Sequence, residues 1–176
     1  MTAPAELLLK QAKTVDPQAF GALYGQYAPE LYRYALCVLG TPADAQDAVQ
    51  DAAVRVYENL QNIRDPRRFK AYFFKTLSNT CKTMLKRRAL TLVDEQPFEN
   101  LQSPHSTESD AILRADLKAA LERLSETERT VVLLSAIGGL SSREIADAVG
   151  LTAGSTRSKL SRALGKMRKY MREHGE

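Results

Sequence analysis

The strongest constraint on the fold of this chain is a series of helix-start signals spread along its length. Three of them place an Asp or Thr directly before a proline, and two more have the pattern Ser-x-x-Glu: Asp16-Pro17, Thr41-Pro42, Asp65-Pro66, Ser125 with Glu128, and Ser141 with Glu144. An Asp, Ser or Thr at such a position caps free backbone N–H groups, proline suits the first helical position, and the Glu completes a capping box. Because no alternating strand pattern competes with these signals, the sequence predicts an all-α protein.

Apolar residues follow the first three signals at helical spacing. One stripe runs from Phe20 to Val38 and ends near Gly40, and the next runs from Ala45 to Leu60. The third signal, Asp65-Pro66, opens a helix with apolar residues at steps of four: Phe69, Phe73, Leu77 and Cys81. These segments predict a compact three-helix unit.

The second half of the chain predicts a separate helical unit. Its first helix has apolar residues that are expected to face inward: Ile112, Leu113, Leu117, Ala120, Leu121 and Leu124. Gly138 and Gly150 stand where glycine commonly ends a helix. Between the two units, the periodicity fades over residues 89–110, where five acids occur without one Lys or Arg. We therefore expect two small helical domains, 1–90 and 111–176, joined by a flexible acidic linker, 91–110.

Composition restricts where such a chain can work. No stretch of 18 apolar residues occurs, so the sequence predicts no membrane insertion, and the first residues lack the features of a signal peptide, so we expect a cytoplasmic protein. Cys37 and Cys81 lie on different predicted helices, which favours reduced thiols in the core over a disulfide.

Residues 141–172 have the pattern of a helix-turn-helix. Between Ala153 and Gly175 stand seven Lys or Arg and a single acid, Glu173. In a helix-turn-helix, the N-terminal residues of the second helix reach base edges in the major groove, while later cations reach phosphates. The candidates for base edges are Ser155, Arg157, Ser158, Lys159 and Arg162, and those for phosphate are Lys166 and Lys169. The alternative is a solvent-exposed cationic face on an ordinary helical hairpin.

Residues 66–88 form a second basic segment, with eight Lys or Arg, four aromatic residues and no acid. Interleaved rings and cations suit single-stranded nucleic acid, whose bases stack on aromatic side chains. Phe69 and Phe73 fit the buried stripe, which leaves Tyr72 and Phe74 as candidates for stacking. The alternative is that only the cations meet the solvent.

A row of acids, Asp44, Asp47 and Asp51, shares one face of the second predicted helix. The row could hold a metal ion, yet acids are also expected near a helix N-terminus, where they complement the dipole. With Gln50 and Arg55, the same face could instead dock a protein partner. No zinc-ligand spacing, phosphate loop or nucleophile motif is present, so we expect no metal, no cofactor and no catalytic residues.

Two blocks of sequence together resemble the extracytoplasmic-function (ECF) group of bacterial sigma-70 factors. The first block contains AFGALYGQYAPELYRYAL, DAQDAVQDAAVRVYENL and FKAYFFKTLSN, and resembles region 2 of that family. The second block, LSETERTVVLLSAIGGLSSREIADAVGLTAGSTRSKLSRALGKMR, resembles region 4. The order of the blocks, and the lack of a region 3 between them, make the resemblance specific.

The resemblance implies a dissociable RNA polymerase subunit that recognises −35 and −10 promoter elements and initiates transcription without a catalytic site of its own. Core RNA polymerase would dock on Asp47, Gln50, Asp51 and Arg55. Residues 61–68 match the loop that captures a flipped −10 base. In region 2, the residues assigned to DNA are Arg64, Arg67, Arg68, Asn79, Lys86 and Arg87. In region 4, the −35 element would be read by Ser155, Arg157, Ser158, Lys159 and Arg162, with Lys166 nearby. An anti-sigma factor is a common partner in the family and is expected here.

Three positions depart from the family pattern. Tyr72 replaces a usual Trp, Thr83 a usual Asp, and Ala53 a bulkier apolar residue, which bears on DNA melting and on the choice of −10 base. Two rival interpretations remain. One is a free-standing helix-turn-helix regulator, and the other is a nucleic-acid-processing enzyme that uses the acidic row with a divalent ion.

Overall fold

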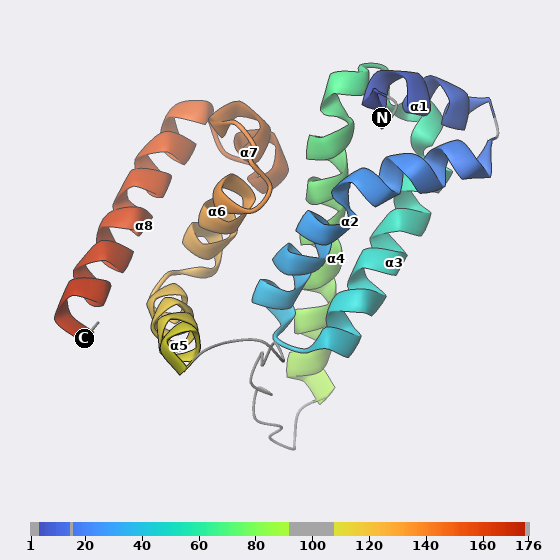
Figure 1. The fold of residues 1–176 in the computed structure, drawn as a ribbon. Helices are drawn as coiled ribbons and strands as arrows, with labels where there is room; N and C mark the ends of the chain where they lie inside the picture. Colours follow the sequence, from blue (N-terminus) through green and yellow to red (C-terminus); the bar gives the residue numbers. More distant parts are fainter. Residues whose placement is uncertain (1–3, 15, 92–107, 175–176) are drawn as a thin grey trace. The chain divides into compact units, whose positions relative to one another are not determined.

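The computed structural model describes residues 4–14, 16–91 and 108–174, with side chains from residue 114 onward in the last range. These residues form eight α-helices and two short 3-10 helices, and none of them lies in a strand (Figure 1). The all-α prediction is therefore confirmed. The chain divides into two compact units, Met1–Phe98 and Glu99–Glu176. No helix in the described ranges is both long and apolar enough to cross a membrane.

Unit 1 is a bundle of three long helices crossed by a short one. Its elements are α1 (Ala5–Lys13), α2 (Pro17–Leu39), α3 (Pro42–Glu58), η1 (Leu60–Asn62), η2 (Pro66–Arg68) and α4 (Phe69–Thr91). Helices α2, α3 and α4 pack against one another, and α1 packs against α2 and contacts both 3-10 helices (Figure 1). Helix α1 was not among the helices predicted from the sequence.

Aromatic rings fill the centre of unit 1. Tyr34, Phe69, Phe73 and Phe74 are each at most 1% exposed. The Tyr34 hydroxyl donates a hydrogen bond to Ser78 Oγ at 3.1 Å, so the polar atom of this buried ring is satisfied. Along α3, the core positions are mostly alanines, which leave room for the neighbouring helices to approach closely.

The expected helix starts of unit 1 are confirmed for α2 and α3. Asp16 accepts a hydrogen bond from the Gln18 N–H at 2.9 Å, and Thr41 Oγ1 accepts one from the Asp44 N–H. The third start differs, because Asp65 caps the 3-10 helix η2 and α4 begins only at Phe69. A proline is the first helical residue at all three starts and supplies the fixed backbone angle that this position needs.

Unit 2 is built around its last helix. It contains α5 (Glu108–Glu122), α6 (Glu126–Ala136), α7 (Ser142–Val149) and α8 (Ala153–His174), and α8 contacts each of the other three. Both capping boxes form as expected. The Arg129 guanidinium donates to the carbonyl oxygens of Leu121 and Leu124, which satisfies acceptors at the end of α5.

Two expectations about packing in unit 2 are wrong. Leu117 was expected to face inward, but it is 46% exposed. The left-handed glycine after α6 is Gly139, at φ 62°, one residue later than expected, because the Leu140 N–H bonds back to the Leu134 carbonyl. At the end of α7, Gly150 is left-handed as expected, at φ 72°.

The two cysteines differ in environment. Cys81 lies in the core, and burial raises the pKa of its thiol to about 12. Cys37 was also expected in the core, but it is exposed on α2. The predicted linker lies outside the described residues, except at its ends, where Thr91 belongs to α4 and residues 108–110 belong to α5.

Candidate nucleic-acid interface

Helices α7 and α8 form the expected helix-turn-helix in unit 2. The left-handed Gly150 ends α7, and the Leu151 N–H donates to the Ala146 carbonyl to complete the turn. Thr152 Oγ1 then accepts a hydrogen bond from the Ser155 N–H at 3.1 Å, which caps the start of α8. Thr156 and Ala163 are fully buried and anchor α8 to the unit. The turn and these anchors therefore fix the direction in which α8 begins.

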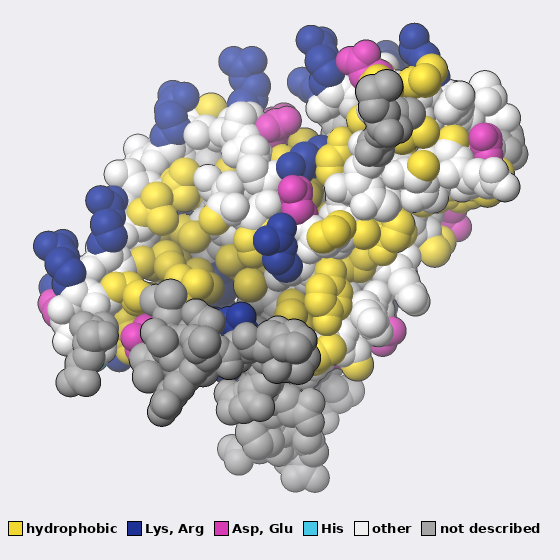
Figure 2. Space-filling model, in the orientation of Figure 1, with side chains coloured by type: hydrophobic (Ala, Val, Ile, Leu, Met, Phe, Trp, Pro, Cys, Tyr) yellow, Lys and Arg dark blue, Asp and Glu magenta, His cyan; other side chains and the backbone are white. Residues whose placement is uncertain are grey.

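The side of α8 opposite this anchor carries the predicted base-reading residues. Four of them are exposed and one is partly buried: Ser155, Arg157, Ser158 and Arg162, with Lys159 partly buried. Figure 2 shows Lys and Arg side chains following the outer side of α8 along its length. Arg162 Nε donates to the Ser158 carbonyl at 3.3 Å, so its guanidinium lies along the helix and is free of any acidic partner among the described residues. This face presents positive charge and polar donors, which suits a phosphate backbone and base edges.

Lys166 differs from Lys169, which pairs with Glu173 on α8 itself, because its acidic partner lies on another helix. Its Nζ lies 2.7 Å from Glu128 Oε1 on α6, and Glu128 is only 8% exposed. Glu128 also accepts the Ser125 N–H at 2.9 Å as part of its capping box. The hydrogen bond from Lys166 is the main cause that holds the pKa of Glu128 below its usual value. Lys166 therefore joins α8 to α6, whatever further role it has at DNA.

Replacing Glu128 with Gln is expected to destabilise unit 2 by about 1–2 kcal/mol at pH 7, because a partly buried charged hydrogen bond is lost. A carboxyl with a lowered folded-state pKa stabilises the fold above its unfolded pKa and loses that contribution as the pH falls through the folded value. The difference between wild type and the Gln variant should therefore shrink below about pH 4.5, the ordinary value. Urea unfolding between pH 7 and pH 3 measures it.

Glu144→Gln is the matched control. Glu144 forms a capping box of the same kind at the start of α7, where its carboxylate accepts the Ser141 N–H at 2.8 Å, and it has no Lys partner among the described residues. Its effect should be smaller and should change less with pH. A Glu128→Gln effect that stayed constant across the pH range would contradict the assigned role of Lys166.

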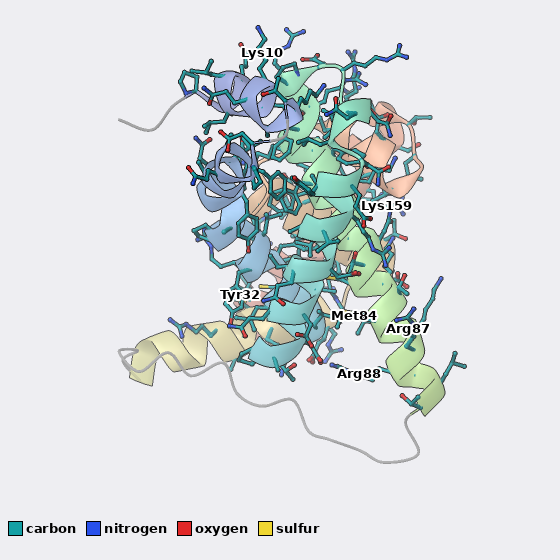
Figure 3. All side chains as sticks on the ribbon, turned by 90° about the vertical axis from the view of Figure 1, so that its right-hand side faces the viewer. Lys10, Tyr32, Met84, Arg87, Arg88 and Lys159 are labelled. Atoms are coloured by element: carbon teal, nitrogen blue, oxygen red, sulfur yellow. The ribbon has the colours of Figure 1, made fainter. Side chains whose placement is uncertain are left out.

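The second basic surface lies in unit 1. The six residues assigned to DNA there are all exposed: Arg64, Arg67, Arg68, Asn79, Lys86 and Arg87. Arg67 donates to Asp65 at 3.1 Å, and this hydrogen bond lowers the pKa of Asp65. Near the end of α4, Arg87 points away from the bundle (Figure 3). Its neighbour Arg88 has a structural role that was not predicted: it donates to the Leu39 carbonyl and to Asp44, and so ties α4 to the end of α2 and the start of α3.

The aromatic residues of this segment are mostly core. Phe69 and Phe73 are 1% and 0% exposed, as expected. Phe74 was a candidate for base stacking, but it is fully buried and packs edge-on against Tyr34 at 5.9 Å between ring centroids, so that interpretation is wrong. Tyr72 is half-buried and stays a candidate for stacking.

The predicted partner-docking face lies on α3. Asp47, Gln50, Asp51 and Arg55 are all exposed, and their spacing places them on one side of the helix. Arg55 pairs with Asp51 at 3.1 Å, and Val54, 55% exposed, stands among them. Asp44, the first member of the acidic row, instead pairs with Arg88. Within the ranges described, no three His, Cys, Asp or Glu side chains gather closely enough to hold a metal ion.

Family models match both units of the chain. The model of sigma-70 region 2 matches residues 23–91, and the model of sigma-70 region 4 matches residues 114–167. The first match covers the helices α3 and α4 with their basic and docking faces, and the second covers the helix-turn-helix.

Curated relatives agree with these matches. The ECF RNA polymerase sigma factor SigE of Mycolicibacterium smegmatis is 32% identical over 159 residues, which cover 86% of this chain and 61% of that protein. The RNA polymerase sigma-E factor of Streptomyces coelicolor is 37% identical over 144 residues, 80% of this chain and 79% of the relative. The ECF factor SigW of Bacillus subtilis is 25% identical over 178 residues, 94% of this chain and 95% of the relative.

Two solved structures share the fold. The structure of CnrH in complex with the cytosolic domain of CnrY has a TM-score of 0.75 at 24% identity and covers 98% of this chain and 100% of that chain. The sigma factor RpoE of Bartonella quintana, in complex with the anti-sigma factor NepR, has a TM-score of 0.69 at 21% identity and covers 87% of this chain and 96% of that chain.

Proposed function

The chain belongs to the ECF group of the sigma-70 family, and from that premise we propose that it is a promoter-specificity subunit of bacterial RNA polymerase. In this proposal it works in the cytoplasm, binds core RNA polymerase through α3, and brings no catalytic residue of its own. The observation that carries the proposal is that region 2 and region 4 occur in order, each with an exposed cationic surface on a separate unit.

Each of the two units has a separate DNA contact. In unit 2, the exposed start of α8 reads the duplex −35 element from the major groove. In unit 1, residues 61–68 hold a flipped base of the melted −10 element, and Asn79, Lys86 and Arg87 contact the strand. Flipping a base costs little once the duplex is open, and a pocket for it gives sequence choice at one position.

Two weak contacts act together because they are connected. Once one unit holds its element, the connection raises the effective concentration of the other unit at the second element. The domain boundaries in this proposal are 1–90 for region 2, 91–110 for the connecting segment and 111–176 for region 4. An anti-sigma factor is proposed as a further partner, since the related factor of Bartonella quintana is solved in complex with one.

Run-off transcription tests the proposal. The protein is mixed with sigma-free core polymerase and candidate promoters, and transcripts should appear only when protein, polymerase and a matching promoter are all present. No transcript and no co-elution with core polymerase would overturn the proposal. Tight binding to an operator without polymerase would instead support a free-standing regulator.

A further inference from the structure

Helix α1 is joined to the segment between α3 and α4 by two reciprocal hydrogen bonds. The Lys13 Nζ donates to the Ile63 carbonyl, and Gln61 Nε2 donates to the Lys13 carbonyl at 2.6 Å. Each side chain therefore holds the backbone of the other segment, although the two residues at each bond lie about 50 positions apart in the sequence. The carbonyl of Lys13 is one of the free acceptors at the end of α1.

The Ile63 carbonyl lies directly before the exposed cations of this segment, so its position affects theirs. Residues 63–65 connect η1 to η2, and they lead directly into the exposed cations of residues 64–68. The Leu60 and Ile63 side chains are 2% and 6% exposed, so they anchor the segment in the core of unit 1. The Ile63 carbonyl belongs to the peptide bond that leads into Arg64. A hydrogen bond to this carbonyl fixes the orientation of the peptide plane between Ile63 and Arg64. It therefore helps to set the direction in which the Arg64 side chain extends.

Helix α1 is itself firmly attached, so it can act as a support. Leu8, Leu9 and Ala12 are buried against the bundle at 6%, 1% and 3% exposure. The helix also contacts η2. The pKa of Arg67 is raised mainly by its hydrogen bond to Asp65 and, to a smaller extent, by the charge of Glu6 on α1. Residues near both ends of α1 thus interact with residues 61–68.

From this geometry we infer that Lys13 is a positioning residue for the loop that receives the −10 base. The inference rests on the proposed function for the role of the loop, and on the two hydrogen bonds for its shape. Lys13 acts through the Ile63 carbonyl and does not contact the base. Its loss should loosen residues 59–65 and change which −10 sequences the protein accepts.

Three full-length variants test this role. Lys13→Met removes the donor but keeps the apolar stem, and Lys13→Arg keeps a cationic donor. Lys10→Met is the matched control, because Lys10 lies on the same helix, carries the same charge and points away from the bundle (Figure 3). All three should retain the buried face of α1 and stay folded, with Lys13→Met lowering the thermal unfolding midpoint by about 6–11 °C and Lys10→Met leaving it near that of wild type.

Hydrogen–deuterium exchange of the free protein measures the loop directly. Lys13→Met should speed exchange in residues 59–65 by about tenfold, the factor that corresponds to the loss of a hydrogen bond worth about 1.4 kcal/mol. Lys10→Met should leave exchange unchanged, and Lys13→Arg should restore most of the protection. Unchanged exchange in Lys13→Met, or equal effects of Lys13→Met and Lys10→Met, would overturn the inference.

Transcription from promoters with single −10 substitutions measures the consequence. Lys13→Met should alter the ratio of transcripts between −10 variants by about threefold or more, with the response to −35 substitutions unchanged. A uniform loss across all −10 variants would refute a role in base choice. A wild-type protein that drives no transcript would refute the proposed function and the −10 role with it, while the exchange experiment would still decide whether Lys13 holds the loop.

Discussion

Replacing Asp47 with Lys is expected to lower the affinity of the protein for core RNA polymerase by about 100-fold or more. The reason is that Asp47 is exposed on the proposed docking face of α3, where a reversed charge would meet the partner group that an acid attracts. Like-charge contact in an interface costs several kcal/mol, and tenfold in affinity corresponds to about 1.4 kcal/mol. Co-elution with sigma-free core polymerase and run-off transcription both measure the loss.

A control for Asp47→Lys must carry the same charge change at a different surface. Glu122→Lys on α5 meets this need, because Glu122 is exposed and lies in unit 2. The control should bind core polymerase nearly as well as wild type, and both variants should bind isolated −35 duplex with unchanged or slightly higher affinity. Equal losses in the two variants would mean that overall charge, and not the α3 face, governs the interaction with polymerase.

The elements that the sequence predicted best are those whose signals are local. The caps at Asp16, Thr41, Ser125 and Ser141 each lie within three residues of the N–H groups they satisfy. The helix periodicity that predicted Phe69 and Phe73 as core is also a property of a single helix. Such features depend little on the rest of the chain, so a reading of the sequence finds them.

The expectations that failed depend on which face of a helix meets a neighbour. Phe74 lies outside the stripe of four-residue steps on α4, yet it is buried, because α4 packs against both α2 and α3 and so has two buried faces. Leu117 shows the reverse, since it fits the apolar stripe of α5 but is 46% exposed. Helical periodicity predicts which side of a helix is apolar, but it does not predict how much of that side a neighbouring helix buries.

Contacts between segments that lie far apart in the chain also could not be predicted from the sequence. Nothing in residues 4–14 indicates that α1 supports a loop about 50 residues later, because the link consists of two side-chain bonds to backbone carbonyls. The pairing of Lys166 with Glu128 was not predicted either, because the two residues lie 38 positions apart, and it reduces the unpaired charge that was expected on α8. The candidate DNA-binding face is therefore concentrated nearer the start of α8 than a count of cations suggests.

Replacing Arg162 with Ala is expected to weaken binding to a matching −35 duplex by about 1–3 kcal/mol, because a guanidinium that reads a base edge makes two hydrogen bonds that the variant lacks. The variant should discriminate less at one base position. Since a base contact neutralises no phosphate, the slope of log affinity against log salt should change little. Fluorescence anisotropy with matched and scrambled duplexes, at several salt concentrations, measures both quantities.

Arg168→Ala is the matched control for Arg162→Ala. Both guanidinium groups are exposed on α8, and each donates through Nε to the carbonyl four residues earlier at 3.3 Å, so the two substitutions remove equivalent contacts within the helix. Arg168 lies nearly two turns further from the start of α8, where a helix in the major groove has left the base edges. Its loss should weaken matched and scrambled DNA alike, and if it binds a phosphate, it should lower the salt slope by about one. If Arg162→Ala also weakened both duplexes equally, Arg162 would be a backbone contact, and the base-reading part of α8 would have to lie in residues 155–159.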